Sequence, residues 1–417
     1  MRRTTALLLA TSLLAAVLLV AGGPARAAIG GLPLPTGVAP AVPGQLVDDG
    51  PLAPTPLCDT EPAALPLPGP AGPLRVGTYN VLHTQDPDGN PTALQRVGML
   101  ADAIAESDAD VLGLQEVAKS ATLAAAAAAD GLDDDDEVTG LMVELIAQDL
   151  AASTSEDWSW CWFASNAHVP LEPEPAAGGG GGPLTELATL GSGQQTGNGS
   201  EFREGVAILS RFPIASPTVK RLSLRMHEAL YCDEIDPTGC QFAVVFDSRV
   251  IMHGVITTPD GPVDLYTSHL AHGVTSESDA TKARQIEEGL AHIAATEDPA
   301  TPTFFVGDFN TEATGQPDEG RYQTILAAGF IDTYGSASSQ DASDPVGTSS
   351  QDVVGEDLTV DRTIDYVFAK HLGVVTVTYG DIIGDKRAER ADTPGADWVW
   401  PSDHLGVVVT LDATPSG

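Results

Sequence analysis

Basic residues are scarce in this 417-residue sequence, which has 20 Lys and Arg against 58 Asp and Glu and a formal net charge of −38. A surface of this charge repels polyanions at long range. Strong nucleic-acid binding is therefore less expected, and a nuclease of this charge would need a local basic patch to bind its substrate. Acidity of this kind also keeps a protein soluble, which is the simpler explanation.

Long apolar runs are also lacking, except for one that follows Arg2 and Arg3 and ends before the sequence Ala25-Arg26-Ala27. Basic residues, a short apolar stretch and small residues are typical of a secretory signal peptide, and the stretch is short for a membrane span. We expect residues 1–27 to be removed. Because this segment contains three arginines and no acids, its removal changes the formal net charge from −38 to −41. The sequence thus predicts a secreted, extracellular monomer without an integral membrane segment.

Cysteine is limited to Cys58, Cys161, Cys232 and Cys240, an even number that allows three disulfide connectivities in an oxidising compartment. We favour Cys232–Cys240, which would close the polar loop CDEIDPTGC, and Cys58–Cys161 by elimination. The spacing resembles no metal site, so a structural role is expected.

Aromatic residues make up 5% of the chain, and three of the five tryptophans fall in the sequence WSWCW. Strand side chains alternate between faces, so Trp158, Trp160 and Trp162 should share one face. We expect that face to belong to the core rather than to a surface that grips a bilayer.

The organisation of the chain changes at Leu74. Residues 28–73 are rich in Pro, Gly and Ala and predict an extended leader, which Cys58 could attach to the rest. Short apolar runs then alternate with helical patterns, notably at 94–107 and 279–295. We predict one large α/β domain over 74–412, with loop insertions near 118–157 and 165–203.

Polar side chains close or open most of the apolar runs: Asn80, Glu116, His269, Asp308, Asn310, Asp365, Asp403 and His404. Alternation along a strand should point Asp308 and Asn310 the same way and turn Phe309 into the opposite layer. If the strand ends meet at one edge, these residues form a single cleft.

This set of side chains suits phosphoester hydrolysis. The carboxylates of Glu116 and Asp403 are ligands for a hard divalent cation. His404 beside Asp365 suits a general base for a water nucleophile, because the acid fixes the tautomer and stabilises the imidazolium. Taken singly, a strand-end Asn or Asp is more often a turn former, so the prediction depends on the whole ordered set.

The ordered motifs TYN, GLQEV, GVAILSRFPI, TSHL, VGDFN, TIDYVF and PSDHLGVVV cover residues 74–412. Together they resemble the endonuclease/exonuclease/phosphatase superfamily, which includes deoxyribonucleases, abasic-site endonucleases, bacterial sphingomyelinases and inositol-polyphosphate phosphatases. The resemblance is to a secreted bacterial member. It implies a four-layer sandwich in which two mixed β-sheets pack face to face and are flanked by helices.

The resemblance also implies roles for individual residues and a Mg²⁺ cofactor, with Mn²⁺ or Ca²⁺ as alternatives. The implied catalytic residues are Asn80, His269, Asp308, Asn310, Asp365 and His404, and the implied metal-binding residues are Glu116, Asp403 and Asn80. We favour His404 over Asp308 as the immediate proton acceptor, because the ordinary pKa of histidine suits that task.

The predicted function is a secreted, divalent-metal-dependent phosphoesterase in which an Asp–His dyad activates water. The substrate is left open among nucleic acid, a phospholipid headgroup and a small phosphate ester. One alternative is an extracellular nuclease acting on DNA or RNA, and another is a catalytically silent binding module on the same fold. The absence of a G-x-S-x-G sequence argues against a serine esterase.

Overall fold

The computed structural model describes residues 56–59, 72–82, 93–119, 141–167, 203–223, 225–231, 241–247, 249–272, 276–315, 318–337, 339–340, 347–349, 360–373, 375–389 and 398–413. The predicted signal peptide, most of the predicted leader, Cys232 and Cys240 lie outside these residues. All of the described residues belong to the same structural unit, Pro43–Gly417.

One mixed sheet has seven strands in the order β1-β4-β5-β3-β2-β17-β14. Neighbouring strands are antiparallel except β2 and β3, which are parallel. The strands are β1 (Leu57–Cys58), β2 (Leu74–Asn80), β3 (Val111–Lys119), β4 (Ser159–Ala167), β5 (Arg203–Ser210), β14 (Val375–Ile383) and β17 (Gly406–Ala413).

The second mixed sheet has six strands in the order β12-β13-β11-β10-β9-β6, in which only β10 and β11 are parallel. Its strands are β6 (Ile214–Arg221), β9 (Val250–Thr258), β10 (Gly261–His269), β11 (Thr303–Asp308), β12 (Ile331–Asp332) and β13 (Asp365–Lys370). Two small ribbons pair β7 (Arg225–Tyr231) with β8 (Gln241–Asp247) and β15 (Ala388–Glu389) with β16 (Trp398–Val399).

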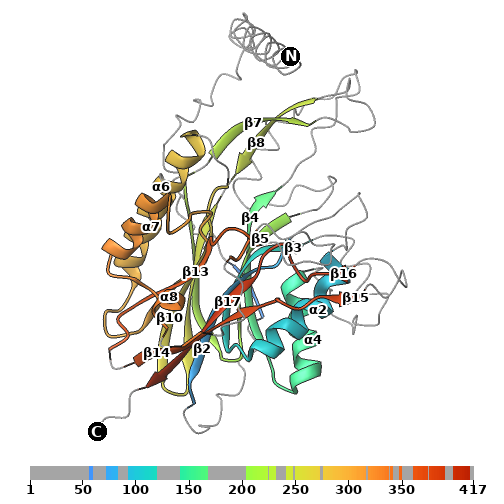
Figure 1. Ribbon diagram of the computed structural model, residues 1–417, viewed down its shortest axis with the longest axis vertical. Helices are drawn as coiled ribbons and strands as arrows, with labels where there is room; N and C mark the ends of the chain where they lie inside the picture. The colour runs from blue at the N-terminus through green and yellow to red at the C-terminus, as the bar shows by residue number, and fades with distance from the viewer. Residues whose placement is uncertain are drawn as a thin grey trace, which may run out of the picture. The chain divides into compact units, whose positions relative to one another are not determined.

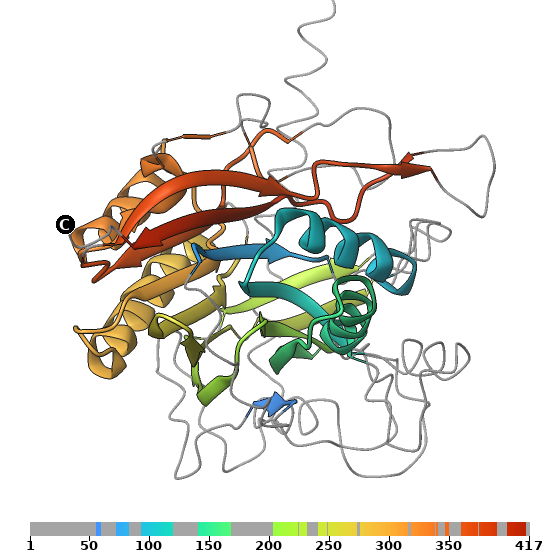
Figure 2. The same ribbon diagram turned by 90° about the horizontal axis from the view of Figure 1, so that it is seen from below.

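Helices cover the outer faces of both sheets. Figures 1 and 2 show α2 (Ala93–Ser107) and α4 (Met142–Thr154) on one side of the pair of sheets, and α6 (Ser276–Thr296) and α7 (Asp318–Ala327) on the other. A short helix, α8 (Thr333–Ser336), follows β12. None of the helices in the described ranges is long and apolar enough to span a bilayer. The arrangement confirms the predicted four-layer sandwich.

Three apolar clusters lie between the four layers, and strand β11 contributes to two of them. Phe304 and Val306 lie in the cluster between the two sheets, whereas Phe305 lies in the cluster under α6 and α7. Phe309 joins the same helix-side cluster, with its ring 4.8 Å from that of Phe305. The alternation therefore directs the next even-numbered side chain, Asp308, toward the space between the sheets.

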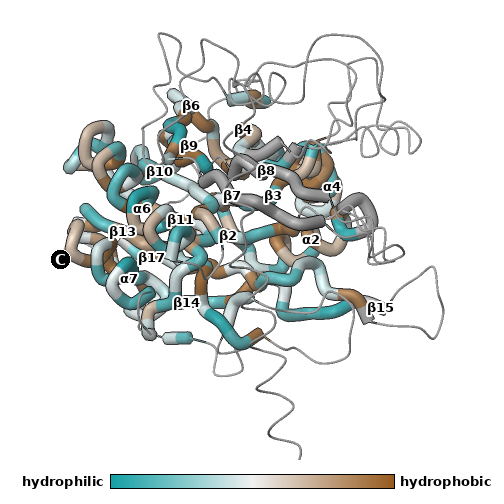
Figure 3. The backbone as a smooth tube through the Cα atoms, turned by 90° about the horizontal axis from the view of Figure 1, so that it is seen from above, coloured by the Kyte–Doolittle hydropathy of each residue, from teal (hydrophilic) through white to brown (hydrophobic). Residues whose placement is uncertain are grey.

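The predicted helices at 94–107 and 279–295 are both present, as α2 and α6. In α2, Val97, Leu100, Ala101 and Ile104 form the buried apolar stripe expected of an amphipathic helix. Helix α4 lies within the predicted insertion near 118–157, and its apolar residues belong to the same cluster. Its tube is largely brown, and thus hydrophobic, in Figure 3.

The tryptophan and disulfide predictions are both confirmed where the structure describes them. Trp158, Trp160 and Trp162 are buried in the cluster beneath α2 and α4. Strand β1, inside the predicted leader, pairs with β4 so that Cys58 and Cys161 lie opposite each other and form a disulfide. This bond attaches the leader, at Cys58, to the seven-stranded sheet.

Candidate active site

Three strands of the six-stranded sheet bring their predicted site residues to one edge. His269 ends β10 and lies in register with Asp308, which ends the parallel strand β11. Asp308 in turn lies in register with Asp365, the first residue of the antiparallel strand β13. The three side chains therefore lie in a row, because register fixes neighbouring strand ends next to one another.

The seven-stranded sheet brings Asn80 and Glu116 to the same place. Asn80 ends β2 opposite Gln115 of β3. Contrary to expectation, β3 does not end at Glu116, because a bulge between Leu114 and Val117 accommodates the extra residues and the strand continues. Glu116 has a φ of 57° in this bulge, a local kink of the kind that redirects a side chain near a functional site.

The Asn80 side chain joins the two sheets. Its Nδ2 donates to Glu116 Oε1 at 3.1 Å and to Asp308 Oδ2 at 3.2 Å, while its Oδ1 accepts from Leu82 N at 3.1 Å. The buried amide thus presents its NH₂ group to both carboxylates. This geometry favours a positioning and hydrogen-bonding role for Asn80, since ligation of a metal through Oδ1 would require the amide to turn.

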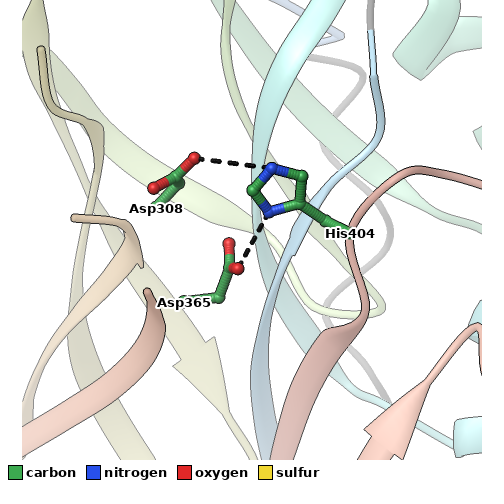
Figure 4. A group of neighbouring side chains, drawn as sticks. All are labelled: Asp308, Asp365 and His404. Atoms are coloured by element: carbon green, nitrogen blue, oxygen red, sulfur yellow. Dashed lines mark hydrogen bonds and ion pairs between the residues drawn. The ribbon is translucent and has the colours of Figure 1, made fainter. Parts of the chain in front are cut away.

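His404 and Asp365 form the predicted dyad. The imidazole Nδ1 lies 2.9 Å from Asp365 Oδ2, and the Nε2 faces Asp308 Oδ2 at 3.9 Å (Figure 4). Both residues are buried, and Thr348 Oγ1 donates to the same Asp365 oxygen at 2.8 Å. In the neutral form of His404 with Nδ1 protonated toward Asp365, the Nε2 lone pair faces Asp308 and can accept a proton.

Burial and mutual charge shift the pKa values of this group. The pKa of Asp308 is raised to about 7, mainly by burial and then by the Asp365 carboxylate, against the opposing effect of His404. Burial opposes the charged form of His404, but Asp365, Asp308 and Asp403 together raise its pKa well above the ordinary value. The surplus of carboxylates therefore favours retention of a proton at this site near neutral pH.

Asn310 lies beside Asp308 for a different reason from the one expected. Strand β11 ends at Asp308, and Asn310 adopts a left-handed conformation with a φ of 48°, so strand alternation does not position it. Its backbone N–H donates to Asp308 Oδ1 at 2.8 Å, and its Nδ2 donates to the Leu270 carbonyl at 3.1 Å. Phe309 does turn into the opposite layer, as predicted.

Helix α6 supports the turns that follow β10 and β11. Lys282 is buried, and its Nζ donates to the Asn310 carbonyl at 3.0 Å. Gln285, one turn further along the helix, accepts from the Ala271 N–H at 2.9 Å and donates to the Ser223 carbonyl at 2.8 Å. One helix face therefore fixes both turns.

His269 lies between carboxylates from both sheets. Its Nε2 is 3.4 Å from Asp308 Oδ2 and 4.0 Å from Glu116 Oε1, and its Nδ1 is 3.7 Å from Glu204 Oε1. Glu204 is buried beside Arg249, with 3.4 Å between Oε1 and Nη1. Glu204 was not among the predicted site residues, although its position at the start of the apolar run EGVAILS was a usable signal.

The loop before β17 places Asp403 next to the dyad. Ser402 Oγ donates to the Asn80 carbonyl at 2.7 Å and accepts from His404 N at 3.2 Å, which fixes the loop against β2. Burial raises the pKa of Asp403, and its proximity to Glu116 adds to the rise, whereas His404 lowers it.

The donor set fits a divalent metal. Glu116 and Asp403 are carboxylates close enough to disfavour each other's charge, and a hard cation between such oxygens relieves that repulsion. Asp308, Asp365 and His404 also have potential ligand atoms within 4.8 Å of one another. In that trio, however, Asp365 Oδ2 and His404 Nδ1 are already hydrogen-bonded to each other, so these two potential metal ligands are occupied.

Thr348 and Ser349 could not have been found from the sequence. Thr348 bonds Asp365, and Ser349 Oγ lies 3.4 Å from His404 Nε2. Both residues come from the stretch GTSS, which has neither periodicity nor a chemical motif. Their positions depend on isolated bridges between Ser349 and both Arg362 and His404.

Several solved structures are similar to this chain. A Bacteroides thetaiotaomicron endonuclease/exonuclease/phosphatase family protein matches with 17% identity and a TM-score of 0.50, covering 83% of this chain and 99% of that one. A Beutenbergia cavernae endonuclease/exonuclease/phosphatase matches with 20% identity and a TM-score of 0.48 over 82% and 72% of the two chains. Sphingomyelinase C from Streptomyces griseocarneus matches with 17% identity and a TM-score of 0.47 over 82% and 99%.

Sequence comparison gives the family. A search of curated proteins finds no significant match. The model of the Endonuclease/Exonuclease/phosphatase family matches residues 77–404, a span that begins in β2 and ends at the dyad histidine. Since this match covers most of the chain, the protein belongs to the endonuclease/exonuclease/phosphatase family.

Proposed function

We propose that the protein is a divalent-metal-dependent phosphoesterase that hydrolyses a phosphoester bond by attack of water. One observation carries the proposal: the Asp365–His404 pair, Asp308 and the Asn80–Glu116 pair meet where the two sheets come together. A base, hydrogen-bond donors and carboxylates are thereby combined within one buried group, as phosphoester hydrolysis requires.

His404 acts as the general base in this proposal. Its Nε2 takes the proton of the attacking water, while Asp365 holds Nδ1–H and stabilises the imidazolium that forms. Asp308, whose Oδ2 lies 3.9 Å from that Nε2, orients the water. The hydrogen bond from Thr348 keeps the Asp365 carboxylate in place.

Asn80, His269 and Asn310 stabilise the phosphate oxygens. The Asn80 NH₂ group and the His269 imidazole lie beside Asp308, where negative charge would develop on a bound phosphate. Donors that are fixed before the reaction are most effective, because they do not reorganise as charge builds.

Glu116 and Asp403 would hold the metal, with Mg²⁺ favoured and Mn²⁺ or Ca²⁺ as alternatives. A cation bound there supplies charge stabilisation to the phosphate and its leaving group. The raised pKa of Asp403 supports this role, since burial beside Glu116 leaves negative charge that a cation would compensate.

The protein is proposed to act outside the cell on a nucleic acid, a phospholipid headgroup or a small phosphate ester. The Cys58–Cys161 disulfide supports an oxidising compartment. Burial of Trp158, Trp160 and Trp162 removes the aromatic residues that would most have favoured a lipid surface.

A substrate panel tests the proposal. Plasmid DNA, RNA, sphingomyelin, inositol phosphates and bis(p-nitrophenyl) phosphate are incubated with the protein and Mg²⁺, Mn²⁺ or Ca²⁺. We expect turnover of at least one substrate by the wild type and its loss in His404→Ala. Absence of turnover across the panel would instead favour a binding module.

A further inference from the structure

We propose that Arg362 forms an anion subsite beside the active site and recognises a second phosphate next to the scissile one. The inference rests on the proposed function and narrows its substrate class. It predicts substrates that carry two neighbouring phosphate groups.

The backbone places Arg362 in a row with the dyad. Ser349 forms antiparallel bridges with Arg362 on one side and with His404 on the other. Paired residues of antiparallel strands project on the same face, and the Ser349 Oγ does lie 3.4 Å from His404 Nε2. With about 4.8 Å between neighbouring strands, the Arg362 backbone lies roughly 10 Å from that of His404, within reach of an arginine side chain.

The side chain extends toward the turn that carries Asn310. Arg362 Nε donates to Glu312 Oε1 at 3.0 Å, and Glu312 follows Asn310 by two residues. Lys282, which contacts the Asn310 carbonyl, has a pKa that is lowered mainly by burial, then by Arg321, and to a smaller extent by the Arg362 guanidinium. The contact with Glu312 therefore places this cation beside the turn that carries Asn310.

Only part of the Arg362 guanidinium is paired with another group of the described chain. The Arg362 and Glu312 side chains are 34% and 36% exposed, and within the described parts of the chain the two Nη groups make no hydrogen bond or ion pair. A half-exposed pair of this kind contributes only about 0–1 kcal/mol. Exchange of Glu312 for a phosphate therefore costs little, and the planar fork of arginine matches phosphate oxygens.

The positive charge of Arg362 favours some of the three proposed substrate classes over others. A second phosphate occurs as the next phosphate of a nucleic-acid strand or as the second group of a small bisphosphate. A cationic headgroup would be repelled by Arg362 and attracted to Glu312 alone. Phosphocholine-type substrates are therefore disfavoured.

Titration calorimetry with inorganic pyrophosphate and inorganic phosphate, in excess Mg²⁺, tests the subsite without requiring turnover. We expect the wild type to bind pyrophosphate more tightly and Arg362→Gln to lose about tenfold of that preference, the scale of a charged hydrogen bond. Glu312→Gln should increase the preference, because it removes the competing carboxylate. Arg284→Gln removes a half-exposed positive charge from α6 and should leave the preference unchanged.

The two possible sources of the second phosphate are separated in further arms. Thymidine dinucleotides with and without a terminal phosphate form one pair, and fructose 1,6-bisphosphate and fructose 6-phosphate form the other. An Arg362-dependent preference in either pair supports the subsite and identifies its source. No preference for pyrophosphate in the wild type, or equal weakening of both inorganic ligands by Arg362→Gln, would overturn it. Failure of the proposed function would appear separately, as absence of hydrolysis across the substrate panel.

Discussion

At the residue scale, the dyad carries the chemistry. His404 Nε2 faces Asp308, and Asp365 holds the opposite ring nitrogen, Nδ1, at 2.9 Å. His404→Ala and Asp365→Asn should each lower kcat by about 10²–10⁴-fold, the usual contribution of general base catalysis.

A second buried Asp–His pair provides the matched control. His253 Nε2 lies 2.8 Å from Asp264 Oδ1, and its ring stacks on Tyr266 in the same sheet. His253→Gln should lower stability but leave kcat within about threefold of the wild type, because the pair takes no part in proton transfer. Equal losses in the His404 and His253 variants would show that the effect is structural.

Asp308 makes stability depend on pH. Its folded-state pKa of about 7 exceeds the ordinary value of 3.8, mainly because of burial. The folded state therefore holds more protons than the unfolded state between these values, and stability falls as pH rises toward 7. In metal-free urea titrations, the wild type should lose about 2–3 kcal/mol of stability between pH 5 and pH 8 from this group.

Asp308→Asn should reduce that loss, since the amide does not ionise. The measured quantity is the free energy of unfolding of the variant minus that of the wild type. This difference should increase as the pH rises. A difference that stays constant between pH 5 and pH 8 would show that Asp308 titrates normally.

At the scale of elements, α6 holds the site together. Gln285→Leu removes hydrogen bonds to Ala271 and Ser223, which should cost about 1–3 kcal/mol of stability. Because Ala271 lies in the turn just after His269, the last residue of β10, loss of this hydrogen bond should displace His269, so that kcat falls while KM changes little. Ile293→Val, at a buried position two turns further along α6, should cost about 0.5–1.5 kcal/mol and leave kcat unchanged. Equal kcat values in the two variants, measured well below both unfolding temperatures, would contradict the positioning role.

The elements also show how far sequence could predict the site. Strand ends such as Asp308 and His269 were predictable, because apolar runs that stop on polar residues mark a sheet edge. The bulge at Glu116 and the left-handed turn at Asn310 were not predictable, since both depend on tertiary contacts rather than on the hydrophobic periodicity of the sequence. Thr348 and Ser349 had no sequence signal, because they meet the site through isolated bridges.

At the scale of the whole molecule, the alternation of apolar runs and helical patterns predicted an α/β domain, and the family resemblance implied the four-layer sandwich that the structure confirms. The Cys58–Cys161 link joins residues 103 positions apart. Closure of a loop of that length is expected to stabilise a protein by about 4–5 kcal/mol, chiefly through the unfolded chain.

The double variant Cys58→Ser, Cys161→Ser tests this contribution. Urea unfolding should show a loss of about 2–5 kcal/mol, with kcat at 25 °C within about twofold of the wild type because both cysteines lie in β1 and β4, at one edge of the seven-stranded sheet. Unchanged stability would mean that the pairing of β1 with β4 suffices without the bond.

The central claim is metal-dependent attack of water assisted by His404. Its most direct test is the rate of hydrolysis of a phosphoester turned over by the wild type, measured before chelation, after chelation and after Mg²⁺ is restored, in wild type and His404→Ala. We predict that the wild type loses its activity on chelation and regains it with Mg²⁺, while His404→Ala stays at least about 100-fold slower throughout. Full activity in the chelated wild type, or in the variant, would contradict the claim.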